Sequence, residues 1–162
     1  ATGQVIATYG EQYKPGIAEH GNGLFCGQHS CSKSEYGYLY LFNNNMCNAP
    51  ASPVILKLKE GNGKLEKVWE YNCATADEQK HERLSCPSGG SVTELPDGRI
   101  FACMPCTNYN KLLIVNKNKK ELWSALLQRR TKPDEQWESG PTYKASYINR
   151  AALVQLIWNT GQ

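Results

Sequence analysis

The chain has 162 residues, which fits one ordinary domain, although all-β architectures often need about 200–250 residues. Its net charge is only +3, and lysine and arginine are spread along it, so the composition gives no support to nucleic-acid binding. No apolar run approaches the roughly 18 residues that span a bilayer, and the first ten residues lack the basic and apolar regions of a signal peptide. We therefore expect a soluble chain that has already lost any export signal.

The first part of the chain predicts a four-stranded β unit. After a lead-in segment over residues 1–24, the run YGYLYLFNN from Tyr36 is rich in aromatic and branched residues and ends at three asparagines. The run PVILKLKEGNGKLEKVWEY follows, and its Gly-Asn-Gly at 61–63 predicts a hairpin. This first unit extends over residues 25–73.

A second unit with the same pattern follows a connecting excursion at residues 74–88. SVTELPDGRIFACMP reads as strand, turn at 96–98 and strand, and NKLLIVNKNKKELWSALL reads as a hairpin with its turn at 116–119. This unit covers residues 89–130. Residues 131–162 begin with a polar loop and are expected to end in a closing strand or a short helix.

The two units align on their tryptophans, Trp69 and Trp123, which stand 54 residues apart and are interpreted as packing residues. Repeats of about 40–55 residues with short antiparallel strands are typical of β-propeller blades. We therefore expect an all-β fold comprising about two blades of a propeller. The alternative is a disulfide-stapled β-sandwich. Because a propeller needs at least four blades, the remaining blades are expected from a longer chain, a companion fragment or further copies.

Five segments carry a family resemblance: FCGQHSC, YLYLFNNN, VWEY, GGSVTELPDGRIFA and ELW. In this order they resemble the PAPS-independent arylsulfate sulfotransferases and their propeller relatives, over residues 25–123. The resemblance implies transfer of a sulfuryl group between phenols through a sulfated histidine, with no nucleotide cofactor. Neutral imidazole is a suitable nucleophile for this reaction.

Carried over residue by residue, the resemblance makes His29 the candidate catalytic residue, with Gln28 and Asn44 as candidate binding residues. His20 is the alternative histidine. Two departures weaken the catalytic interpretation: residues 46–50 contain no arginine, and residues 89–91 contain no histidine. Transfer of a sulfuryl group requires cationic or hydrogen-bonding groups around its oxygens.

The seven cysteines predict an oxidising, extracellular location and disulfide bonds. The expected pairs are Cys73 with Cys86, Cys26 with Cys31, and Cys103 with Cys106, which leaves Cys47 unpaired. A bridge from Cys31 to Cys47 is the alternative. No metal is expected, because the spacing of Cys26, His29 and Cys31 relative to the distant CxxC does not fit a standard zinc site.

Aromatic side chains can line a site for a phenol or a carbohydrate. Trp137, in the polar DEQWESG loop, is the candidate for contact with a ligand or partner. The leading hypothesis is a secreted, non-catalytic binding or assembly module with no cofactor, no nucleic-acid partner and no membrane span. The alternative hypothesis is an aryl sulfotransferase that uses His29.

Overall fold

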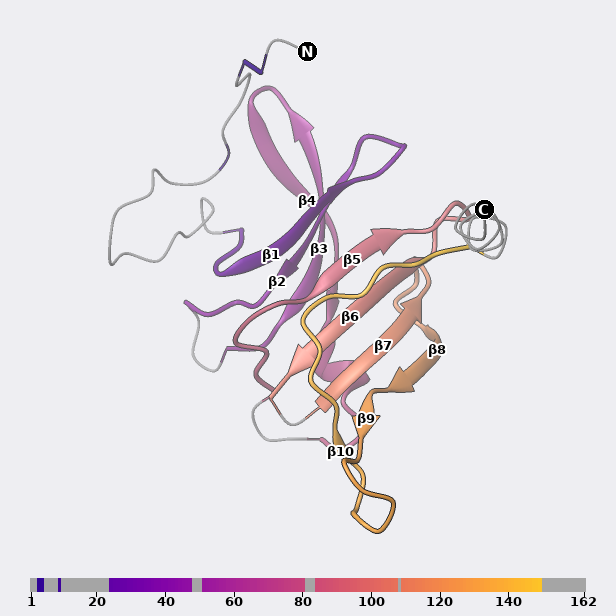
Figure 1. Cartoon of the computed structure of the whole chain (residues 1–162). Helices are drawn as coiled ribbons and strands as arrows, with labels where there is room; N and C mark the ends of the chain where they lie inside the picture. Colours follow the sequence, from indigo (N-terminus) through magenta and orange to yellow (C-terminus); the bar gives the residue numbers. More distant parts are fainter. Residues whose placement is uncertain are drawn as a thin grey trace.

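The computed structural model of the chain describes residues 3–4, 9, 24–47, 51–80, 84–107 and 109–149. These residues form two four-stranded antiparallel sheets, which confirms the all-β expectation (Figure 1). The only helical element among them is one turn of 3₁₀ helix, η2 (Cys73–Ala76). No helix in this described part is long and apolar enough to cross a membrane.

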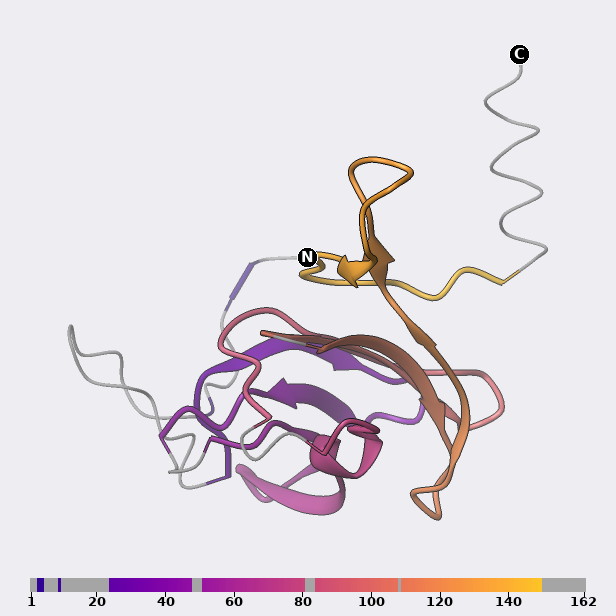
Figure 2. The same ribbon diagram turned by 90° about the horizontal axis from the view of Figure 1, so that it is seen from below.

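Sheet A is a meander of four consecutive strands: β1 (Gln28–Lys33), β2 (Leu39–Asn43), β3 (Val54–Gly61) and β4 (Lys64–Asn72). Sheet B repeats the meander with β5 (Ser91–Glu94), β6 (Ile100–Cys106), β7 (Tyr109–Val115) and β8 (Glu121–Leu126). The short strands β9 (Gln128–Arg129) and β10 (Glu138–Ser139) pair with each other. Figure 2 shows the loop between them projecting away from both sheets.

The tight hairpins follow from residues that tolerate a left-handed backbone. Asn62 and Gly63 both have positive φ between β3 and β4, as a two-residue turn requires. Gly98 has a φ of +78° between β5 and β6. The hairpins expected at 61–63, 96–98 and 116–119 are therefore confirmed.

The two sheets stack face to face and enclose the main core (Figure 2). Sheet A contributes its inner face, and sheet B contributes alternate residues of its central strands. The buried side chains are Tyr40, Phe42, Ile55, Tyr71, Val92, Ile100, Ala102, Met104, Leu113 and Val115. The sheets approach each other most closely along β1, β2 and β5. Gly90 lies against the ring of Phe42, so closely that a side chain there would overlap the ring.

The sheets repeat each other in detail. In sheet A, Trp69 is paired with Lys57, and the register then shifts by one residue. In sheet B, Trp123 is paired with Ile114, and the register shifts at the same place. Each tryptophan therefore adjoins a β-bulge, at positions that correspond in the two meanders.

The corresponding faces of the two sheets point in the same direction along the stack. The row Tyr40, Lys57 and Trp69 faces sheet B. The matching row of sheet B, which contains Phe101, Ile114 and Trp123, lies on the outer face, turned away from sheet A. Trp69 is half-buried at the sheet interface, whereas Trp123 is 47% exposed.

The expected disulfide pairs are wrong. The bonds join Cys26 to Cys47 and Cys86 to Cys106, and the thiols of Cys31, Cys73 and Cys103 are free. Cys103 and Cys106 lie in one strand, where residues three apart are about 10 Å from each other, too far for a disulfide.

The remaining expected pairs fail for related reasons. Cys26 and Cys31 are separated by most of the extended strand β1, and Cys31 is free, so the alternative bridge from Cys31 to Cys47 is also wrong. Cys73 lies in the turn η2 and is fully buried, while Cys86 bonds Cys106. Each bond instead fastens the segment that precedes a first strand to the second strand of the same sheet or to the turn just after it.

Candidate functional site

His29 lies on β1 and points toward the junction between the two sheets. A bulge follows it, since the pairing of β1 with β2 shifts between His29 and Ser32, and Ser30 has a φ of 54°. The imidazole is half-buried, and its ring meets the ring of Tyr143 edge-on, with 5.9 Å between the ring centres.

Asn44 fixes the orientation of the imidazole. Its side chain is fully buried directly after β2, and its Oδ1 lies 2.8 Å from His29 Nδ1. The amide nitrogen of Asn44 donates to the carbonyls of Cys86 and Gly89. Because an amide oxygen only accepts, Nδ1 of His29 carries the hydrogen, and Nε2 of the neutral ring keeps a lone pair. This arrangement suits a nucleophile or a general base.

The other two predicted binding residues lie elsewhere. Gln28 precedes His29 on β1, so its side chain points to the opposite face of sheet A. It lines an apolar hollow of about 210 Å³ together with Tyr9, Phe25, Cys31, Leu39, Leu41, Leu58 and Leu65. Thus the structure brings Asn44 to His29 but does not bring Gln28 there.

Trp137 lies in the loop between β9 and β10, where it is 57% exposed. The guanidinium of Arg130 stacks on its ring at 4.9 Å, a cation–π contact. The tryptophan borders a hollow of about 160 Å³ that also includes Gln79, Asn110 and Gln128. This loop is separate from the surroundings of His29.

A buried polar cluster links the two sheets next to the core. Glu94 of β5 accepts hydrogen bonds from Tyr40 Oη at 2.7 Å and from Lys57 Nζ at 3.0 Å. Burial raises the pKa of Glu94, but the hydrogen bonds from Tyr40 and Lys57 outweigh it and leave that pKa below its ordinary value. Burial and the contact with Glu94 raise the pKa of Tyr40. The cluster therefore holds a carboxylate, an ammonium and a neutral phenol.

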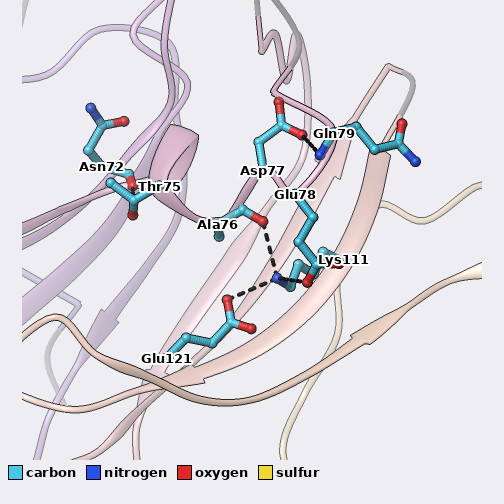
Figure 3. A network of polar contacts seen from close by, with 8 residues as sticks. All are labelled: Asn72, Thr75, Ala76, Asp77, Glu78, Gln79, Lys111 and Glu121. Atoms are coloured by element: carbon cyan, nitrogen blue, oxygen red, sulfur yellow. Dashed lines mark hydrogen bonds and ion pairs between the residues drawn. The ribbon is translucent and has the colours of Figure 1, made fainter.

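A second buried cluster is centred on Lys111 of β7, which is 1% exposed (Figure 3). Its Nζ donates to the carbonyl of Ala76 at 3.1 Å, to Glu78 at 3.0 Å and to Glu121 at 2.9 Å. The three hydrogens of the ammonium are thus all used. The cluster fastens η2 and the turn after it to sheet B, which is a structural role.

No sequence pattern indicates the contacts of Tyr143, Glu94 or Lys111, because each contact depends on how distant segments meet. His20 and His81 lie outside the described residues. Within the described ranges, no group of three or more His, Cys, Asp or Glu side chains is arranged to hold a metal ion.

Comparison with known proteins finds no match for this chain. No family model matches its sequence, and neither a curated protein nor a solved structure aligns with it significantly.

Proposed function

We propose that the chain is a two-blade segment of a secreted β-propeller that resembles the arylsulfate sulfotransferases and acts as a non-catalytic assembly module. The observation that carries the proposal is the exposure of Trp123. Its counterpart Trp69 is covered by the next sheet and donates from Nε1 to the carbonyl of Lys117 at 2.9 Å. Trp123 occupies the same place in sheet B but is 47% exposed.

The stacking of the sheets supports the propeller. The face of sheet A that sheet B covers corresponds to the outer face of sheet B, where Trp123 is exposed. An interface of this kind can propagate, because each sheet offers the next one the corresponding row of positions. A further blade on the outer face of sheet B would bury Trp123 as sheet B buries Trp69.

An extracellular location is supported by the two disulfides, since such bonds persist mainly in oxidising compartments. The surroundings of His29 support the non-catalytic role. Its partners among the described residues, Asn44 and Tyr143, are uncharged, whereas sulfuryl transfer requires groups that stabilise negative charge on the transferred oxygens.

One observation favours the alternative, an aryl sulfotransferase that uses His29. Because Nδ1 of His29 donates to Asn44, the lone pair of the neutral imidazole lies on Nε2, as a nucleophile requires. In a complete propeller, other blades would have to supply the missing cationic groups. The two hypotheses share the fold and differ only in what surrounds Nε2.

The assembly hypothesis is tested by the mass of the native, non-reduced protein, measured by light scattering. We expect a particle larger than one chain. Trp123→Lys should dissociate it, while Tyr36→Lys, a matched change at another exposed aromatic residue, should leave it intact. A stable particle with the mass of a single chain would overturn the proposal.

The same native particle separates the two hypotheses. We expect no transfer of sulfate from a nitrophenyl sulfate donor to a phenol. Release of nitrophenolate that depends on the phenol, and that His29→Ala abolishes, would establish the enzyme instead. Tyr36→Ala, a change at an exposed tyrosine, serves as the control for nonspecific loss of activity.

A further inference from the structure

A hollow of about 210 Å³ opens between the two sheets, at the end of their interface where the hairpin turns lie. Sheet A contributes Tyr38, Lys57 and Trp69 to its wall. The β5–β6 turn of sheet B contributes Gly98, and the β7–β8 turn contributes Lys117. None of these residues contacts His29 or Asn44, so the hollow is separate from the candidate site described above.

The hollow is formed before any ligand binds. Trp69 donates from Nε1 to the carbonyl of Lys117 at 2.9 Å, which fastens the wall of sheet A to a turn of sheet B. Gly98 has a φ of +78°, and a Cβ built on it would meet no atom within 4 Å, so the turn leaves this side open. A ligand therefore pays little for ordering the site.

Two aromatic rings stand on the wall of sheet A. Tyr38 is half-buried, and Lys57 Nζ lies 4.0 Å from the centre of its ring. Trp69 stacks on Tyr71, with 6.3 Å between the ring centres and 13° between the ring planes. Because both rings are already held by these contacts, they offer a rigid aromatic surface to a flat ring.

Positive charge surrounds the hollow. Lys57 Nζ donates to Glu94 at 3.0 Å, which uses one of the three hydrogens of the ammonium. Lys117 is exposed, and its ammonium has no partner within the described part of the chain. Lys119 and Lys120 follow in the same turn. No carboxylate lines the hollow among the described residues, so an anionic group is favoured there.

The size and the hydrogen bonding of the hollow favour a single aromatic ring. A cavity of about 150 Å³ is enough for benzene, whereas sites for drug-sized ligands occupy about 300 Å³ or more. Two polar groups of the lining already have partners, since Trp69 Nε1 bonds Lys117 and Tyr40 Oη bonds Glu94. A sugar ring would leave several hydroxyls without partners, which is costly, whereas an aromatic ring has none to satisfy.

We propose that this hollow binds a small aromatic acid, whose ring lies against Tyr38 and Trp69 and whose anionic group is bound by Lys57 and Lys117. The hollow lies within one chain, so the proposal is independent of the assembly hypothesis. It assigns to the module a class of ligand that the sheets hold at their shared edge.

Benzoate is the probe, and nitrogen–proton NMR of the labelled 162-residue chain follows its binding. We expect a saturable shift of the indole N–H of Trp69, with a Kd of about 1–10 mM for a ligand of this size. The indole signals of Trp123 and Trp137 should not move. Benzyl alcohol has the ring without the charge, and acetate has the charge without the ring. Each should bind at least about fivefold more weakly than benzoate.

Substitutions locate the two halves of the ligand. Lys117→Gln should weaken the binding of benzoate about fivefold, because it removes the free ammonium. Lys120→Gln, the same change of charge in the same turn but outside the hollow, should leave the affinity unchanged. Tyr38→Leu should weaken the binding as well, whereas Tyr36→Leu, at an exposed tyrosine outside the hollow, should not.

Several results would overturn the proposal. They are an unmoved Trp69 signal, equal affinities for benzoate and benzyl alcohol, and equal effects of Lys117→Gln and Lys120→Gln. Tighter binding of glucuronate than of benzoate would identify a sugar acid instead and would also overturn it. A monomeric native particle that bound benzoate as expected would contradict the assembly hypothesis and leave this proposal standing.

Discussion

Sheets A and B share a strand order, a bulge beside a tryptophan and a disulfide near their first two strands. Corresponding residues nevertheless differ in how deeply they are buried. Trp69 is packed and hydrogen-bonded, whereas Trp123 is largely exposed. The residue type and the local backbone are the same in both places. The difference arises because sheet B covers the face that carries Trp69, whereas the face that carries Trp123 is open. The burial of each tryptophan therefore depends on the adjacent sheet.

The chemistry of the two faces also differs. Tyr40 and Lys57 of sheet A both donate hydrogen bonds to Glu94 of sheet B. The matching positions of sheet B are Phe101 and Ile114, which are apolar. A sheet that docks on this second face therefore needs an apolar or aromatic residue in place of the glutamate, and Tyr147 already meets that description.

We expect the largest difference between the two sheets when their disulfides are removed one at a time. The two bonds close loops of similar length, with separations of 21 and 20 residues, so each is expected to contribute about 3 kcal/mol. We expect the double variant Cys86→Ala with Cys106→Ala to lose more stability than Cys26→Ala with Cys47→Ala, because both sulfurs of the first pair lie in the core. Urea unfolding measures both, and the reverse order would contradict the account of the core.

Substitution of Trp69 and Trp123 measures how much the covering sheet contributes to the stability of each. Trp69→Ala removes buried contacts and the hydrogen bond to Lys117, and we expect it to cost about 2–4 kcal/mol. Trp123→Ala in the isolated chain should cost less than about 1 kcal/mol. Thermal unfolding of the two variants checks this. Equal costs would mean that Trp123 is already covered in solution.

The smallest expected effect concerns the polar link between the sheets. Glu94→Gln removes the charge that pairs with Lys57, and we expect a loss of about 1–3 kcal/mol at pH 7. The folded-state pKa of Glu94 is lowered, so its contribution is complete above its unfolded pKa and is lost as the pH falls through the folded value.

Urea titrations from about pH 6 to pH 3 should therefore show the gap between wild type and Glu94→Gln closing toward low pH. Other carboxyl groups titrate equally in both proteins and cancel in the difference. A gap that widened toward acid would contradict an ionised, stabilising Glu94.

The sequence was sufficient for the sheets because their hairpins are encoded locally. Alternating apolar residues and the turns at 61–63 and 116–119 identify each meander without knowledge of the rest. Only part of the candidate site could be predicted from the sequence. The resemblance pointed to His29 and Asn44, which the structure joins, but the alternation of β1 sends Gln28 to the other face.

The disulfides were mispredicted because short sequence gaps were favoured over the repeat. Cys26 and Cys47 stand 21 residues apart, and Cys86 and Cys106 stand 20 apart. These similar gaps lie in the first half of each unit, so comparing the cysteine spacing of the two units points to both pairs. Each disulfide joins two parts of one repeat unit, and neither disulfide closes a single short loop.

The placement of those two bonds has a consequence for how the molecule comes apart. All seven cysteines are described, and each disulfide lies within one sheet, so no covalent bond other than the chain itself spans residues 77–85. A single proteolytic cut there would leave two internally cross-linked halves held together only by noncovalent contacts, namely the shared core and the polar links such as those at Glu94 and Lys111. Such a nicked protein would keep its native mass in solution yet separate into two bands on a denaturing gel without reductant.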